Sequence, residues 1–330
     1  LALRPIMPQT LKDIRSCIEK ELEEFEVHFR QAIQSRIPLL DKISLYIIKT
    51  KGKQFRPMIS LLCAKLFGEI NENTFTAATM VELLHTATLV HDDVVDESDQ
   101  RRGFFSINAL WKNKIAVLVG DYLLSRGLLV ALNRNQFEML KILSNTVSDM
   151  SEGELLQLEK ARRLDITKEI YYQIIRQKTA SLIATSCHCG ALTTCHDTSK
   201  LEHIHHFGMN LGIAFQIRDD LMDLESDIMG KPKIQDIREK KMTLPLILAL
   251  GSAPANESKQ IIRGIRSDSE NEDVIRRTVE FIHRFDGVRK ATEEMNQHRD
   301  EALRSLAHLP SGEIQSALSR LCYFVTEREK

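Results

Sequence analysis

Apolar residues recur every three or four positions along most of the chain, which is the period of an amphipathic helix. The clearest stripe lies near the start, behind a capping-box-like pair at Thr10 and Asp13. It comprises Leu11, Ile14, Ile18, Leu22, Phe25 and Phe29. We expect this stripe to face the core, although a subunit interface would show the same pattern.

The same periodicity predicts six further helices and no sheet. They fall near residues 58–67, 76–96, 115–132, 137–161, 167–195 and 201–223. Only 14 Gly and 8 Pro occur in 330 residues, and such scarcity of helix breakers favours a nearly all-helical chain. We expect residues 1–330 to form a single all-α domain.

Two of the predicted helices end in the same acidic pattern, D-D-x-x-D. The first set is Asp92, Asp93 and Asp96, and the second is Asp219, Asp220 and Asp223. On a helix the first and last members lie on one face, about 5–6 Å apart, where like charges repel. Mg²⁺ compensates such pairs, because it binds one or two carboxylates and fills its other positions with water and substrate phosphates. The pattern predicts a cavity that holds a phosphate-bearing substrate through metal ions.

Basic residues at four places could bind the same anion. They are Lys53 with Arg56, Arg101 with Arg102, Lys178, and Lys231 with Lys241. Each one alone is more often a solvated surface charge. The Arg101–Arg102 pair is a better candidate, because it follows Asp96 by five residues and must share a rim with the first cluster.

Two polar residues interrupt the apolar helices that lead into the clusters. His85 lies two helical turns before Asp92, and Gln216 precedes Asp219 by three residues. A hydrogen-bonded core role is the alternative for both. The polar segment 225–243 follows the second cluster directly and is the best candidate for a lid.

Composition narrows the class of protein. The formal net charge of −1 gives no basic face for nucleic acid. The six cysteines lie in apolar segments, as expected for reduced thiols of an intracellular protein. The start lacks a signal peptide's apolar core, and no segment reaches about 18 uninterrupted apolar residues, so we expect a cytoplasmic protein without a transmembrane segment.

The stretch 82–103, ELLHTATLVHDDVVDESDQRRG, resembles the first aspartate-rich motif of trans-polyprenyl diphosphate synthases. The same family is matched in order by Asp121 in VGDYLLS, Lys178 and Thr179 in KTASL, GIAFQIRDDLMD at 212–223, and GKP with KMTLP at 230–245. The resemblance covers nearly the whole chain. It implies the isoprenoid synthase helical bundle around a central cavity, usually as a homodimer.

The resemblance also implies roles for the site residues. An allylic diphosphate would bind through three Mg²⁺ ions to Asp92, Asp96 and Asp219. The supporting carboxylates would be Asp93, Asp220 and Asp223. The groups sharing the diphosphate charge would be Arg101, Lys178, Lys231 and Lys241. Isopentenyl diphosphate would be bound by Lys53, Arg56, His85 and Arg102.

Two further implications concern the reacting carbon chain. Thr179 and Gln216 would stabilise the allylic cation with their oxygens, and Arg328 or Lys330 would help to cover the site. Chain length would depend on the residues before Asp92, where short-chain relatives commonly carry aromatics. Ala87 and Thr88 are small, and the next bulky candidate is Leu84. We therefore expect a long-chain product of the quinone side-chain type, similar to octaprenyl diphosphate.

Three positions depart from the family pattern, because lysine stands where glycine is usual: Lys51, Lys112 and Lys240. Two alternative functions remain, a non-catalytic subunit of a heteromeric synthase and a terpene cyclase. A His-Asp phosphohydrolase lacks the further His and Asp that it would need. The six retained aspartates argue against the silent subunit, and the second D-D-x-x-D argues against the cyclase.

Overall fold

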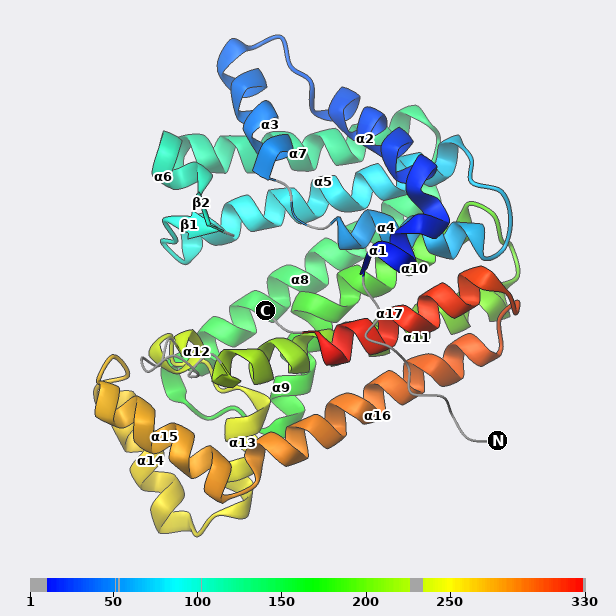
Figure 1. The fold of residues 1–330 in the computed structure, drawn as a ribbon. Coiled ribbons are helices and arrows are strands. Elements are labelled where there is room, and N and C mark those ends of the chain that lie inside the picture. Colours follow the sequence, from blue (N-terminus) through cyan, green and yellow to red (C-terminus); the bar gives the residue numbers. More distant parts are fainter. Residues whose placement is uncertain (1–10, 51, 53, 102, 226–233, 329–330) are drawn as a thin grey trace.

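Helices form almost all of the structure, a computed structural model that describes residues 11–50, 52, 54–101, 103–225 and 234–328. Figure 1 shows them as a bundle of long, roughly aligned helices, with shorter helices at one end. The prediction of an all-α fold is confirmed. The two strands among the described residues are two residues long each, β1 (Gln100–Arg101) and β2 (Phe104–Phe105).

The N-terminal stripe belongs to the core. It spans α1 (Leu11–Arg15), a 3₁₀ turn (Ser16–Ile18) and α2 (Glu19–Ile33), and its Ile14, Ile18 and Phe25 are fully buried. Next come α3 (Pro38–Thr50) and α4 (Phe55–Lys65). Helix α4 begins three residues earlier than predicted, because Pro57 lies in its first turn, where a missing N–H costs nothing.

Helix α5 (Glu72–Val95) carries the first aspartate cluster. A capping box starts it: the Asn71 side chain accepts from the Asn73 backbone N–H, and the Thr74 hydroxyl accepts from that of Asn71. The helix packs against α4, α7 (Asn113–Asn133) and α10 (Ser181–Leu192). Between α5 and α7 lie the small hairpin and α6 (Ile107–Trp111).

The segment 167–195, predicted as one helix, forms three successive helical elements in the structure. Thr167 caps α9 (Lys168–Ile175) by accepting from the Ile170 N–H at 3.4 Å. A π-helical turn (Arg176–Ala180) then leads into α10. The second aspartate cluster lies on α11 (Thr198–Glu225), which packs against α10 and α16.

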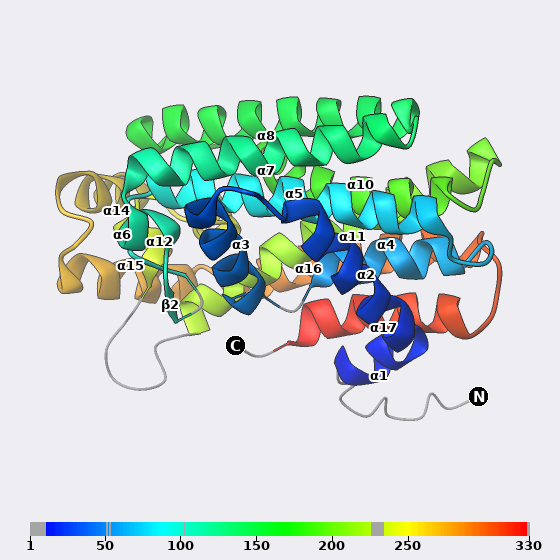
Figure 2. The ribbon, with the colours of Figure 1, turned by 90° about the horizontal axis from the view of Figure 1, so that it is seen from above.

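The remaining helices surround this centre. They are α8 (Phe137–Arg163), α12 (Gln235–Arg238), α13 (Leu244–Ser252), α14 (Ala255–Ser267), α15 (Glu272–Arg284), α16 (Gly287–Ala307) and α17 (Glu313–Glu327). Helices α7 and α8 lie side by side on one outer face (Figure 2). The six cysteines form no disulfide, and all but the half-buried Cys17 are buried, as predicted for reduced thiols.

The C-terminal ends of α5 and α11 point to the same end of the bundle, near the hairpin and α12 (Figure 1). Both aspartate clusters therefore sit at helix ends that carry the negative end of the helix dipole. Among the described helices, only α7 is long and apolar enough to cross a membrane by length and composition, and 33% of its apolar window is buried.

Candidate active site

Asp92 lies half-buried in the last turn of α5 and has a strongly shifted pKa. Burial raises the pKa of this carboxyl to about 6. The nearby Lys178 and Arg101 oppose the shift, whereas the carboxylates of Glu154 and Asp96 add to it. A bound divalent cation would relieve this repulsion.

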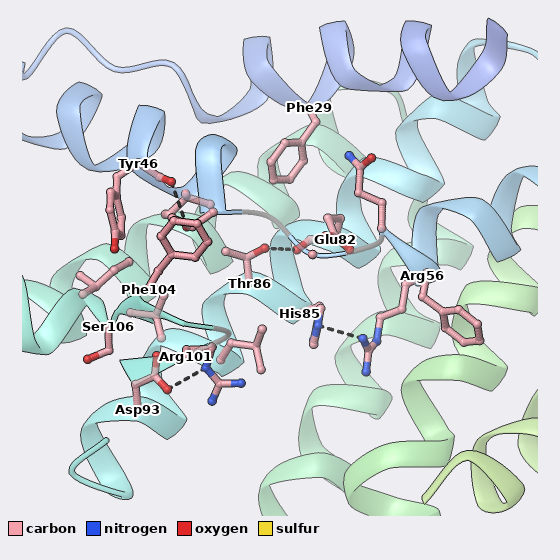
Figure 3. Close-up of a pocket in the computed structure, with 18 of the residues that line it drawn as sticks. Phe29, Tyr46, Arg56, Glu82, His85, Thr86, Asp93, Arg101, Phe104 and Ser106 are labelled. Carbon is pink, nitrogen blue, oxygen red and sulfur yellow. Dashed lines mark hydrogen bonds and ion pairs between the residues drawn. The ribbon is translucent and has the colours of Figure 1, made fainter. Parts of the chain in front are cut away.

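Asp93 points away from that face, into the protein. Its carboxylate, 4% exposed, accepts a hydrogen bond from Arg101 Nε at 2.7 Å (Figure 3). Its backbone carbonyl accepts from Asn108 Nδ2 at 3.2 Å. Burial raises the pKa of Asp93, and Arg101 opposes that shift. Asp93 thus fixes the hairpin that carries Arg101 against the end of α5.

Asp220 occupies the equivalent inward position on α11. It is 4% exposed and accepts hydrogen bonds from Tyr171 Oη at 2.7 Å, Gln216 Nε2 at 3.1 Å and the Leu244 N–H at 3.2 Å. Burial nevertheless raises its pKa to about 6. The contacts join α9, α11 and α13 at one carboxylate.

Asp219 is paired with the last described residue of the chain. Arg328 Nη2 lies 2.5 Å from Asp219 Oδ1, and its guanidinium lies 3.8 Å from the centre of the Phe215 ring. Arg218 holds the same segment by donating to the Arg328 carbonyl at 2.8 Å. Burial raises the pKa of Asp219, and Arg328, Arg218 and Arg56 oppose the shift. The sequence analysis expects Arg328 to help cover the site, and the structure places Arg328 in direct contact with Asp219.

Asp223 contacts Asp236, a residue that the sequence analysis did not single out. Its carboxylate accepts from the backbone N–H groups of Gln235, at 3.3 Å, and Asp236, at 3.1 Å, at the start of α12. This brings Asp236 to the second cluster, where burial, Asp220 and Asp223 raise its pKa to about 7. In the sequence, Asp236 is one of several acidic residues in the predicted lid segment, so nothing there marked it as a site residue.

Lys178 and Thr179 lie on the π-helical turn. Lys178 Nζ forms an ion pair with Glu154 and donates to Gln157 Oε1 at 3.4 Å. Thr179 Oγ1 donates to Gln216 Oε1 at 2.9 Å. Sequence reasoning missed Glu154 and Gln157; their spacing of three on one helix face was the available signal.

The second cluster borders a cavity of about 240 Å³. Its lining includes Gln157, Lys178, Thr179, Gln216, Asp220, Asp236 and Lys241. Burial lowers the pKa of Lys241, but Glu239, Asp236 and Asp96 outweigh it, so the pKa is raised. Lys241, which lines this cavity, thus lies within the field of Asp96 from the first cluster and of Asp236 beside the second.

A larger cavity of about 500 Å³ lies on the other side of Asp93. Its polar lining includes Arg56, His85, Arg101 and Arg328. Arg56 Nη1 lies 2.8 Å from His85 Nε2, so two residues predicted to bind isopentenyl diphosphate meet there (Figure 3).

Five residues that the sequence analysis singled out lie outside the described residues: Lys51, Lys53, Arg102, Lys231 and Lys330. On α5, Ala87 and Leu84 are buried and Thr88 is half-buried, and none of the three lines either of the two cavities.

Two of the lysines that replace glycine have left-handed backbones. The φ angle is 75° at Lys112, where ψ is 153°, and 57° at Lys240. Glycine adopts these conformations without the steric penalty of a Cβ. The departures from the family pattern therefore coincide with backbone strain.

The acidic residues fit a hard divalent cation. Mg²⁺ prefers oxygen ligands, and here carboxylates with raised pKa values converge at two helix C-termini, where a cation is favoured. Lys178 forms an ion pair with Glu154, and Lys241 forms one with Asp236. Both lysines could also bind a polyanion.

The comparisons agree with this geometry. Residues 37–282 match the family model of polyprenyl synthetase. The octaprenyl diphosphate synthase of Escherichia coli is 31% identical, over 97% of this chain and 99% of that one. A polyprenyl synthase of Caulobacter crescentus, solved with calcium and isoprenyl diphosphate, is 32% identical with a TM-score of 0.90, over 99% of this chain and 100% of that one. A decaprenyl diphosphate synthase of Rhodobacter capsulatus is 33% identical with a TM-score of 0.92, over 97% and 99%. The predicted isoprenoid synthase fold is confirmed, and the chain belongs to the polyprenyl synthetase family.

Proposed function

We propose that the protein is a trans-prenyltransferase that adds isopentenyl diphosphate units to an allylic diphosphate and makes a long-chain all-trans polyprenyl diphosphate. The observation that supports this proposal is that Lys178 and Lys241 line one cavity with Asp220 of the second cluster and interact electrostatically with Asp92 and Asp96 of the first. The long-chain relatives support the product class.

The allylic diphosphate would lie between the clusters. Asp92, Asp96 and Asp219 would hold divalent cations, which we propose to be three Mg²⁺ ions. Bound there, the cations act as Lewis acids towards the departing diphosphate. Calcium with isoprenyl diphosphate in the Caulobacter crescentus relative supports a divalent metal. Lys178, Lys241 and Arg101 would share the diphosphate charge.

Buried supporting groups orient these ligands. Asp93 holds the Arg101 hairpin, and Asp220 joins three helices. Gln216 Nε2 donates to Asp220, and Gln216 Oε1 accepts from Thr179 Oγ1, so both side chains are held in place beside the cavity that they line. Their oxygens would act there as fixed dipoles that stabilise the allylic cation.

Isopentenyl diphosphate would bind on the Arg56 side. Arg56, held by His85, would grip its diphosphate, with Lys53 and Arg102 as proposed partners. The double bond of isopentenyl diphosphate attacks the cation, a carbon–carbon bond forms, and a proton leaves, accepted by the released diphosphate. Lys231 stays a proposed partner of the allylic diphosphate, whose charge it would share.

The growing chain would run along α5 past Ala87 and Thr88 towards Leu84. Ala87 and Thr88 leave less bulk there than aromatic residues would, which supports a product longer than farnesyl diphosphate.

We propose a single domain that forms a homodimer in the cytoplasm. Large apolar side chains are exposed on α7 and α8, which suits contact with a second copy. They are Val117, Leu118, Leu129, Leu132, Phe137, Leu155 and Leu158.

The deciding experiment incubates the purified protein with farnesyl diphosphate, labelled isopentenyl diphosphate and Mg²⁺, and separates the products by length. We expect an all-trans ladder that ends at one long product. Asp92→Ala should abolish incorporation and leave the fold intact, and Asp300→Ala, an exposed aspartate on α16, is the matched control. No incorporation with any primer would favour the silent subunit, and a cyclic hydrocarbon would favour the terpene cyclase.

A further inference from the structure

A group of metal-ligating side chains lies where α2 packs against the start of α5. Among the described residues, Glu24, His28 and Glu72 each bring one ligand atom within 4.8 Å of the other two. Glu72 is the first residue of α5, and Asp92 lies in its last turn. Because a helix rises 1.5 Å per residue, about 30 Å separates these two residues along α5. The group is therefore remote from the candidate active site.

Two helices place the three ligands. Glu24 and His28 are four residues apart on α2, so their side chains lie on one face of that helix. Glu72 approaches from α5, whose start is fixed by the Asn71 cap, where the Asn71 side chain accepts from the Asn73 N–H at 2.9 Å. The backbone that carries the ligands is thus helical at all three positions.

The imidazole of His28 is held in a fixed orientation. Its ring stacks on Phe75, with a centroid distance of 4.8 Å and an interplanar angle of 7°. Phe75 is 4% exposed, so the imidazole rests on the core. In this orientation His28 Nε2 lies 3.9 Å from Glu72 Oε1. The ligand atoms of a tetrahedral zinc site lie roughly 3.4 Å apart, so small rotations of the two glutamate side chains close the site.

The charges around the group suit a divalent cation. The carboxylates of Glu24 and Glu72 balance its two positive charges, and α2 carries further acids at Glu19, Glu21, Glu23 and Glu26. The N-terminal end of the α5 dipole opposes a cation. So does Arg134, whose Nη2 donates to Glu72 Oε2 at 2.9 Å. Glu72 Oε1 is the oxygen that faces His28.

The nitrogen ligand decides which kind of metal fits. Mg²⁺ and Ca²⁺ prefer oxygen ligands, whereas imidazole suits Zn²⁺. Zn²⁺ also binds glutamate oxygens, and many zinc sites combine three protein ligands with a water. We propose that Glu24, His28 and Glu72 bind Zn²⁺, with water in the fourth position. The ion ties α2 to the start of α5, and the site does not depend on the proposed function.

The experiment titrates the whole protein, without a histidine tag, with Zn²⁺ against a chromophoric chelator in excess Mg²⁺. The parent is compared with His28→Phe, which keeps a ring against Phe75 and removes the nitrogen ligand. Zn²⁺ bound at the aspartate clusters is common to both proteins and cancels in the comparison. We expect the parent to bind one more Zn²⁺ than His28→Phe, and equal numbers would overturn the proposal.

Matched variants test the individual ligands. Glu24→Gln should weaken binding of this ion about tenfold or more, since even changes outside the ligand set commonly cost that much. Glu23→Gln, its exposed neighbour on α2, is the control and should bind like the parent. His196→Phe, which removes an exposed imidazole elsewhere, is the control for His28→Phe. Equal affinities in Glu24→Gln and Glu23→Gln would contradict the proposed ligand set.

Two further readouts locate the ion. With Co²⁺ in place of Zn²⁺, a four-coordinate site with a nitrogen ligand absorbs visible light more strongly than six-coordinate carboxylate sites. We expect this absorbance in the parent and its loss in His28→Phe. Arg134→Gln removes the positive charge beside Glu72 and should tighten Zn²⁺ binding. A Co²⁺ spectrum that His28→Phe leaves unchanged, or an affinity that Arg134→Gln leaves unchanged, would place the ion elsewhere and refute the inference.

Discussion

Lowering the pH should weaken Mg²⁺ binding by an amount that depends on the pKa of Asp92. Its pKa is raised to about 6, so at about pH 5 roughly ten molecules in eleven carry the proton there. A cation needs the carboxylate. The apparent affinity at about pH 5 should therefore be about tenfold weaker than at about pH 7.5, a difference of about 1.4 kcal/mol.

Isothermal titration calorimetry measures this directly. Mg²⁺ is titrated into the substrate-free protein at both pH values, each in two buffers of different ionisation enthalpy, which counts the protons released. Asp220, with a pKa of about 6, and Asp236, with a pKa of about 7, add to the release. The Asp92→Asn variant isolates the contribution of Asp92, because it binds no proton in this range.

The same protonation decides the sign of the effect on stability. In the unfolded chain these carboxyls titrate near 3.8, so the metal-free folded state holds protons more tightly. The contribution of Asp92, Asp220 and Asp236 to the stability of the metal-free protein is then greatest below about pH 4 and is lost as the pH rises through about 6 to 7. Mg²⁺ should raise the melting temperature more at about pH 7.5 than at about pH 5. An affinity that is equal at both pH values, or no proton release at the lower one, would refute the reasoning.

Three further substitutions test other parts of the structure. Ala87→Phe should shorten the longest product seen by chromatography, and an unchanged length would remove α5 as the channel wall. Gly190→Ala should destabilise by about 1–3 kcal/mol or more, because the added Cβ would lie 2.1 Å from the Ser60 carbonyl oxygen; an unchanged melting curve would contradict this packing. Lys112→Gly and Lys240→Gly should each stabilise the fold by about 1 kcal/mol in thermal melts, since φ is 75° and 57° at these positions, and a lower melting temperature would show that the lysines are compensated.

Hydrophobic periodicity was enough to predict most of the long helices up to α11, but the prediction named no helix after residue 223, where α12 to α17 lie. It did not delimit α3, whose apolar residues surround the helix: Ile43 and Ile47 are buried while Leu39 and Leu45 are exposed.

The sequence also could not supply Asp236. Its approach to the cluster depends on the Asp223 carboxylate, which accepts from the first backbone N–H groups around α12. Glu154 reaches the site because α8 lies beside the π-helical turn that carries Lys178. Such contacts are set by how helices pack. The spacing of Glu154 and Gln157 shows that they share a helix face, but it does not show which element that face meets.

Within each D-D-x-x-D pattern, the middle aspartate has a different role from the first, and helix geometry explains why. Successive residues are about 100° apart around a helix of 3.6 residues per turn. Asp92 and Asp93, like Asp219 and Asp220, therefore point in different directions, and Asp93 and Asp220 turn towards neighbouring elements. There each is 4% exposed and hydrogen-bonded, Asp93 to the hairpin and Asp220 to α9 and α13. At both helix ends the second aspartate is therefore an anchor beside the proposed metal ligand, and replacing the anchor should loosen the elements that carry Arg101 or Lys241 and leave the proposed ligand in place.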